Sequence, residues 1–152
     1  MRFCLYHLAL LLVGCSEAPR VGPPELLDVL EVDRALALCG PNRGPAPCEV
    51  TDSLRRYFVA FDSSGVVCHY TEWRMVPLTI WDSSFRAMLN TFRSRLGESQ
   101  LLGTRFHQWS ERDFTIVLTN QRADYEPPSP EDSLGAVIMG FSIPQSPDCP
   151  RG

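Results

Sequence analysis

Lysine is absent from this chain. All 14 basic residues are arginines, and with 18 acidic residues they give a formal net charge of -4. Sequence-independent binding to nucleic acid depends on a basic surface, so this charge balance argues against a nucleic-acid partner. The planar guanidinium of arginine suits carboxylate and phosphate ligands, but the codon usage of a GC-rich genome explains an all-arginine chain more simply.

Catalytic and cofactor motifs are missing as well. The sequence contains no nucleophile elbow, no phosphate-binding loop and no dinucleotide fingerprint. It has no Cys-x-x-Cys pair, and no two cysteines stand two to four residues apart, as the ligands of a structural zinc site usually do. We therefore predict a non-enzymatic protein without a cofactor or a metal.

A few residues could still carry chemistry, but each has a simpler structural role. Cys68 and His69 are adjacent, yet neighbours on a strand point to opposite faces and would not form a thiol–imidazole pair. His107 could face a ligand, and a half-exposed strand histidine is the simpler alternative. Glu111 and Asp113 fall at an expected hairpin turn, where acidic residues are routine. Core packing, rather than stacking on a sugar, is the expected role of the three tryptophans, Trp73, Trp81 and Trp109.

The first segment has the form of an export signal. Arg2 precedes an apolar run from Phe3 to Val13, which ends at Gly14 and Cys15. About 20 apolar residues are needed to span a bilayer, so this shorter run fits the core of a cleavable signal better than a membrane helix. A buried helix of the folded domain would leave the cysteine at its end unexplained.

The end of this run, Leu12-Val13-Gly14-Cys15, resembles the lipobox of bacterial lipoproteins. The resemblance implies diacylglycerol on the sulfur of Cys15, cleavage before it, and acylation of the new amino group. Residues 1–14 would be the signal peptide, and residues 15–24 the lipidated cysteine and its tether. Ser16 stands where an aspartate would favour inner-membrane retention, which points to the outer membrane. Ordinary cleavage after Ala18 is the competing interpretation, but Pro19 would then follow the cut.

Four cysteines remain for the exported domain, Cys39, Cys48, Cys68 and Cys149. An even number of thiols in an oxidising compartment predicts two disulfides, with three possible connectivities. Cys39 and Cys48 bracket a proline- and glycine-rich loop, and closing it would stabilise the fold by about 2–3 kcal/mol. That pairing leaves Cys68, on an expected strand, to hold Cys149 in the C-terminal tail.

Helical spacing of apolar residues is clearest in Asp82–Gly97. Asp82 or Ser83 is the expected N-cap, and Gly97 the expected C-terminal stop. A second helix is expected over Glu25–Leu38, where an alternating pattern also allows a strand. The apolar residues on one face of the clearer helix, which we expect to pack against Leu134–Ile143, are Phe85, Met88, Leu89, Phe92 and Leu96.

Strands are predicted where aromatic and β-branched residues lie between turn signals. The expected strands are Tyr57–Phe61, Val66–Met75, Thr104–Trp109, Phe114–Asn120 and Leu134–Ile143. The last is an apolar run that suits a central strand covered on both faces, and it follows a polar loop over 121–133. The order α-β-β-α-β-β-β predicts a single α+β domain over residues 25–152, with an antiparallel sheet of about five strands and helices on one face.

The first half of this domain has a helix running into Cys39-Gly40-Pro41-Asn42, followed by a hairpin. In this it is similar to the small outer-membrane-assembly lipoproteins of the SmpA/BamE type, in which a Leu-Gly-x-Pro turn follows the helices. Cys39-Gly40-Pro41 departs from that turn, and the Gly-Met-Thr helix start of those proteins is missing here.

A stripe of polar residues on the second helix, Arg86, Asn90 and Arg93, is a candidate surface for a partner. Phosphates, carboxylates or an acidic protein could bind there, although a solvated helix face carries arginine in any case. The anchor, the small domain and the missing motifs predict a non-catalytic envelope lipoprotein that binds or scaffolds another protein. The alternatives are a ligand-binding lipoprotein, which needs a concave apolar pocket, and a small hydrolase, which needs converging catalytic residues.

Overall fold

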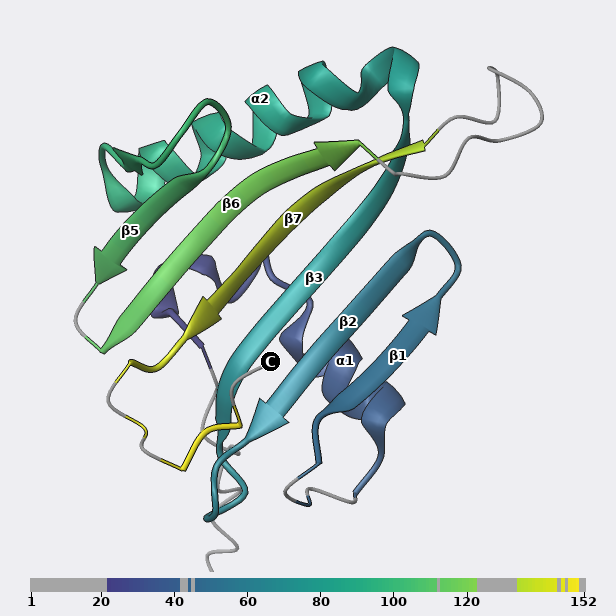
Figure 1. Ribbon diagram of the computed structural model, residues 1–152, viewed down its shortest axis with the longest axis vertical. Helices are drawn as coiled ribbons and strands as arrows, with labels where there is room; N and C mark the ends of the chain where they lie inside the picture. The colour runs from purple at the N-terminus through teal and green to yellow at the C-terminus, as the bar shows by residue number, and fades with distance from the viewer. Residues whose placement is uncertain are drawn as a thin grey trace, which may run out of the picture.

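A seven-stranded antiparallel sheet in the order β1-β2-β3-β7-β6-β5-β4 dominates the protein (Figure 1). The computed structural model describes residues 22–41, 44, 46–111, 113–122, 134–144, 146 and 148–150. The strands are β1 (Cys48–Asp52), β2 (Arg55–Phe61), β3 (Val67–Pro77), β4 (Gln100–Leu101), β5 (His107–Glu111), β6 (Phe114–Arg122) and β7 (Leu134–Ser142). The helical elements are η1 (Pro24–Leu26), α1 (Val32–Cys39) and α2 (Leu78–Leu96).

The expected fold, an α+β domain with about five strands, helices on one face and the order α-β-β-α-β-β-β, is wrong. The described part of the chain has seven strands and is predominantly sheet, with only α1 and α2 longer than a single turn. The two strands that were not predicted, β1 and β4, form the edges of the sheet. They have five and two residues, too few for alternation of apolar and polar residues to be distinctive.

The hairpin of β2 and β3 and that of β5 and β6 form close to where they were expected. β5 begins at His107 rather than at Thr104, because residues 102–106 make the turn that connects it to β4. The lipobox with Cys15, residues 16–21 of the tether and residues 123–133 of the polar loop lie outside the described residues.

The helix expected over Asp82–Gly97 is confirmed as α2, but it begins earlier, directly after Pro77. Neither Asp82 nor Ser83 caps it; the hydroxyl of Ser83 donates to the carbonyl of Ile80 instead. The cause is tertiary packing in the first turns, where Trp81 Nε1 donates to the carbonyl of Ala136 at 3.1 Å. The C-terminal end is as expected, because Gly97 has φ 80° and its N–H bonds to the Arg93 carbonyl.

The helix expected over Glu25–Leu38 is interrupted. It forms as η1 and α1, and the segment Val29–Glu31 between them is not helical. In this segment the Val29 carbonyl accepts a hydrogen bond from Arg74 of β3 at 2.7 Å. The N–H of Glu31 donates to the carboxylate of Glu72 at 3.3 Å. Side chains of β3 therefore take backbone groups that a continuous helix would use itself.

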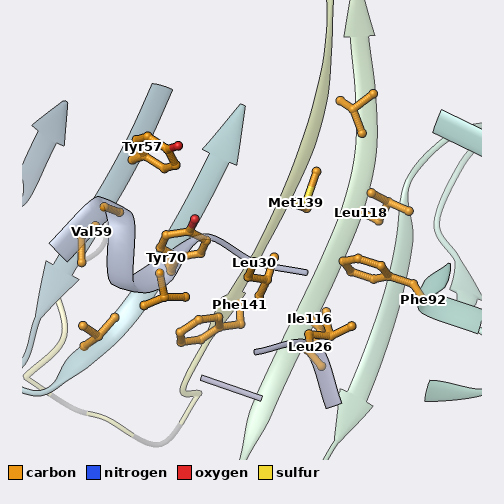
Figure 2. Packing of buried hydrophobic residues seen from close by; sticks show 14 of the residues in the cluster. Leu26, Leu30, Tyr57, Val59, Tyr70, Phe92, Ile116, Leu118, Met139 and Phe141 are labelled. Carbon is orange, nitrogen blue, oxygen red and sulfur yellow. The ribbon is translucent and has the colours of Figure 1, made fainter. Parts of the chain in front are cut away.

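One apolar cluster joins the helices to the sheet (Figure 2). α2 contacts β7, β3, β6 and η1, while α1 contacts β1 and β2. Phe85, Leu89 and Phe92 of α2 are buried, and Met88 and Leu96 pack at the margin of the cluster. Large side chains in this core come from five strands, from α2, and from η1 and the residues that follow it: Leu26, Leu30, Tyr57, Phe61, Tyr70, Phe85, Phe92, Trp109, Ile116, Leu118, Met139 and Phe141.

β7 is central, between β3 and β6, as expected. Its apolar sequence does not reflect cover on both faces, because Ile138 remains half-exposed. Its glycines have a packing role instead. A Cβ at Gly140 would lie 2.1 Å from the Tyr70 carbonyl oxygen, and one at Gly135 would lie 2.6 Å from the indole of Trp81. β7 is therefore apolar partly because close neighbours leave no room for side chains.

Two disulfides close the fold, Cys39–Cys48 and Cys68–Cys149, with S–S distances of 2.03 and 1.99 Å. This confirms the expected disulfide bonding. The first closes the loop between α1 and β1, and the second fastens the C-terminal tail to β3. No helix in the described ranges is both long and apolar enough to cross a membrane.

Candidate functional site

One face of the sheet is crossed by no helix or strand of the described chain (Figure 1). The strand registers place its residues in cross-strand rows, one of them Arg56–Trp73–Ile138–Thr119 and the next Phe58–Thr71–Gly140–Val117. A third row contains His69, Ser142 and Thr115. We define the open face by the side chains that these rows expose or half-expose: Arg56, Phe58, His69, Thr71, Trp73, Thr115, Val117, Thr119 and Ile138.

The centre of the open face carries aromatic, β-branched and hydroxyl side chains. The rings of Phe58 and His69 meet edge to face with centroids 5.5 Å apart, and His69 Nε2 lies 3.0 Å from the Thr71 hydroxyl. Burial lowers the pKa of His69, so this imidazole is neutral at pH 7. Charge enters only toward the β1 edge, where Arg56 lies 5.5 Å from the centroid of the Trp73 ring. The centre of the face is thus uncharged.

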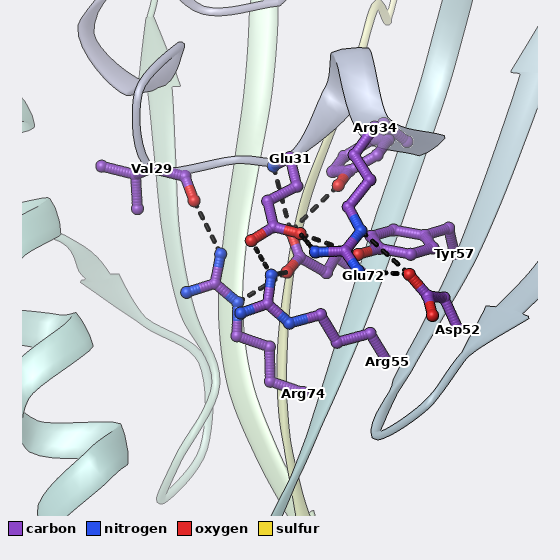
Figure 3. A network of polar contacts seen from close by, with 9 residues as sticks. Val29, Glu31, Arg34, Asp52, Arg55, Tyr57, Glu72 and Arg74 are labelled. Carbon is purple, nitrogen blue, oxygen red and sulfur yellow. Dashed lines mark hydrogen bonds and ion pairs between the residues drawn. The ribbon is translucent and has the colours of Figure 1, made fainter. Parts of the chain in front are cut away.

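A network of charged and polar side chains lies on the opposite, helix-covered face of the sheet and is centred on Glu72 (Figure 3). This carboxylate is fully buried and accepts hydrogen bonds from the Tyr70 hydroxyl at 2.9 Å and Arg74 Nε at 2.5 Å. Burial raises the pKa of Tyr70 far above its usual range, and the negative charge of Glu72 raises it further. Tyr70 therefore remains a donor, and the pair binds Val29–Glu31 to β3.

The same network continues toward β1 through Glu31. Its carboxylate accepts a hydrogen bond from the Tyr57 hydroxyl at 2.8 Å and pairs with Arg55. Arg34 of α1 lies 3.6 Å from the same carboxylate and pairs with Asp52 of β1. With the buried pair on β3, the network holds three carboxylates and three guanidinium groups, so its charges balance. We call it the acid–arginine network. It joins the η1–α1 segment, residues 24–39, to β1, β2 and β3 of the sheet.

A serine–histidine pair was not expected from the sequence. Ser99 Oγ lies 2.7 Å from His107 Nδ1, because the pairing of β4 with β5 brings the two residues together. Burial lowers the pKa of His107, and the positive charge of Arg93 lowers it further. However, Ser99 follows the C-terminal end of α2, where the helix dipole is negative and would repel a developing oxyanion. The pair therefore suits anchoring of the β4 segment better than acyl transfer.

The other residues singled out in the sequence are separated by the fold. Cys68 is buried and disulfide-bonded, whereas His69 lies on the open face, so the two form no dyad. Asp113 is exposed in the turn after β5, as expected of an acidic turn residue. The three tryptophans lie in different environments. Trp109 is in the core, Trp81 packs at the margin of the core, and Trp73 is on the open face. Within the described ranges, no three His, Cys, Asp or Glu side chains are grouped to hold a metal ion.

The arginine stripe of α2 keeps the expected spacing on the helix. Arg86 and Asn90 are exposed, whereas Arg93 is half-buried, with its Nε 3.4 Å from the Glu98 carboxylate. Arg95 is directed elsewhere and pairs with Asp28 beside η1. Two of the three arginines in this region thus have acidic partners within the chain.

The chain was compared with protein-family models, with curated proteins and with solved structures, and none of the three comparisons finds a match.

Proposed function

We propose that this chain is a bacterial envelope lipoprotein, held by lipid on Cys15, most simply at the outer membrane, and that its domain binds another envelope protein without catalysing a reaction. The lipobox-like segment Leu12–Cys15 supports the anchor, and the two disulfides suit an oxidising compartment. The single observation that carries the binding role is the open face. The similarity of the first half to SmpA/BamE-type lipoproteins belongs to the same proposal.

The chemistry of the open face favours a protein over a small ligand. Interface cores are enriched in aromatic side chains and depleted of charge, and the open face has Phe58, Trp73 and Ile138 around an uncharged centre. Small-molecule sites are concave, whereas a pleated sheet presents a broad surface. The hydroxyls of Thr71 and Thr119 can form hydrogen bonds within such a contact. The partner that fits is a flat, largely apolar protein surface with neutral hydrogen-bonding groups around it.

Site-specific photo-crosslinking in cells tests this proposal. A photoreactive phenylalanine analogue replaces Val117, on β6 in the middle cross-strand row of the open face, or Arg86, in the exposed arginine stripe of α2. We expect one defined crosslinked adduct from position 117 and none from position 86. Val117→Glu should abolish co-purification of the protein identified in that adduct, because it places an unpaired charge in the interface.

The control variant is Arg86→Glu, which changes charge on the other surface and should leave co-purification intact. An adduct from position 86 alone would show that the stripe of Arg86, Asn90 and Arg93 binds the partner, and that the open face does not. Thermal unfolding of each variant must match that of the unmodified protein, so that lost binding is not lost folding.

A further inference from the structure

The turn between β4 and β5 concentrates exposed apolar side chains. Leu101, Leu102 and Phe106 are 54%, 43% and 36% exposed. Other exposed apolar residues, such as Leu54 and Val66, occur singly in other turns. Isolated exposed apolar side chains are ordinary, whereas grouped ones mark an interaction surface. We call residues 101–106 the apolar hairpin.

The apolar hairpin is fixed to the domain at its base. Leu101 pairs with His107, and the N–H of Leu102 donates to the Phe106 carbonyl at 2.8 Å. Gly103 has φ 85°, the left-handed conformation that lets the chain turn here. The guanidinium of Arg105 lies 4.8 Å from the centroid of the Trp81 ring and 3.5 Å from the Asp82 carboxylate. The exposed leucines therefore belong to a supported loop, which can insert without first having to fold.

The apolar hairpin itself carries one charged residue, Arg105, and no aspartate or glutamate; Asp82 of α2 pairs with this arginine. The side chain of Arg105 is 47% exposed. Leucine and phenylalanine next to a single arginine suit the boundary between acyl chains and anionic headgroups, where the apolar groups insert and the cation stays at the surface.

The proposed anchor would hold the apolar hairpin close to a bilayer. Gly22, the first described residue, is seven positions after Cys15, a reach of at most about 25 Å. Gly22 lies beside the Phe141 ring, and the register leads from Phe141 to Ile116 and on to Trp109 of β5. Two strand spacings are about 10 Å. The tether therefore leaves the domain beside β7, in the middle of the sheet, two strand spacings from β5 and the base of the apolar hairpin.

We propose that the apolar hairpin inserts into the interface of the bilayer that holds the lipid of Cys15. This inference rests on the proposed lipid anchor and extends it: the acyl chains retain the protein, and the hairpin fixes the orientation of the domain. A tethered loop meets the bilayer at a high effective concentration, so three inserted side chains are enough to hold an orientation that they could not maintain in an untethered protein.

The test uses the full lipoprotein in vesicles of phosphatidylethanolamine and phosphatidylglycerol. Leu102→Cys provides a thiol for an environment-sensitive dye, since Cys39, Cys48, Cys68 and Cys149 are disulfide-bonded. Leu54→Cys is the matched control, because Leu54 is 51% exposed in the turn between β1 and β2, at the opposite edge of the sheet. We expect a blue shift and quenching by nitroxide-labelled lipids at position 102 and neither at position 54.

Flotation of the same samples measures the anchor separately. If the protein floats with the vesicles but the dye at position 102 gives the same emission and quenching as the dye at position 54, the hairpin inference is wrong and the anchor stands. If the protein does not float, both proposals fail. A blue shift that nitroxide lipids do not quench would place protein around the hairpin and would also overturn the inference. Leu101→Ser combined with Phe106→Ser should abolish the quenching at position 102 without changing the fold, because both replaced side chains are exposed.

Discussion

Replacing Glu72 by glutamine tests whether the acid–arginine network holds the domain together. Glutamine keeps the size of the side chain but removes the charge that faces Arg74, whose Nε lies 2.5 Å away. It also turns an amide nitrogen toward groups that donate, the Tyr70 hydroxyl and the Glu31 N–H. Breaking a buried ion pair on one side costs about 3–5 kcal/mol. A domain of this size has a total stability of about 5–15 kcal/mol, so the melting temperature should fall by roughly 10–20 °C.

Urea unfolding with the disulfides intact, followed by circular dichroism and tryptophan fluorescence, measures this loss. Glu49→Gln is the matched control, because Glu49 pairs with Arg56 while their side chains are 53% and 56% exposed. An exposed pair contributes less than about 1 kcal/mol. If Glu72→Gln also changes the unfolding free energy by less than about 1 kcal/mol, the carboxylate does not hold the η1–α1 segment and the description of the network is wrong.

The anchor, the core and His107 each give a further prediction. Cys15→Ala should block lipidation and release the protein from membranes; equal palmitate labelling of both forms would contradict it. Phe92→Ala should lower the unfolding free energy by about 3–5 kcal/mol, because its side chain is fully buried, whereas Arg86→Ala should change it by less than about 0.5 kcal/mol; an unmoved Phe92→Ala melting curve would disprove the docking of α2. The folded pKa of His107 lies below its unfolded value, so its contribution is present above about pH 6.5 and lost as pH falls toward the folded pKa. Stability should therefore decline as the pH falls below about 6.5, less steeply in His107→Gln, and equal slopes in the two proteins would refute this assignment.

Local patterns were enough to predict parts of the fold that depend on neighbours in sequence. The β2–β3 hairpin, most of α2 and its end at Gly97 follow from turn residues, helical spacing and a C-terminal glycine. The pairing of the cysteines was also anticipated, since one pair brackets a loop. The break at Val29–Glu31 could not be predicted, because the groups that cause it, on Glu72 and Arg74, are more than 40 residues away.

The sequence of β3 contains a signal of the acid–arginine network. Tyr70, Glu72 and Arg74 alternate along β3 and therefore share a face with buried aromatic residues. A carboxylate and a guanidinium on the buried side of a strand need partners, which identifies the strand but not the partners, Val29 and Glu31, between η1 and α1. The open face was missed for a different reason: only the register shows that Phe58, Trp73 and Val117, from three strands, lie on the same surface.

The pairing of β3 with β7 determines when the domain can be completed. It joins β3, residues 67–77, to β7, residues 134–142. Cys68 can form its disulfide only with Cys149, which lies 81 residues later. Contacts so distant in sequence form late and leave strand edges unpaired until then. The middle of the sheet is therefore assembled last, after residues 134–142 have become available to pair with β3. Until that moment both halves expose unpaired strand edges, which can pair with other chains, so the incomplete domain is the form most prone to aggregate.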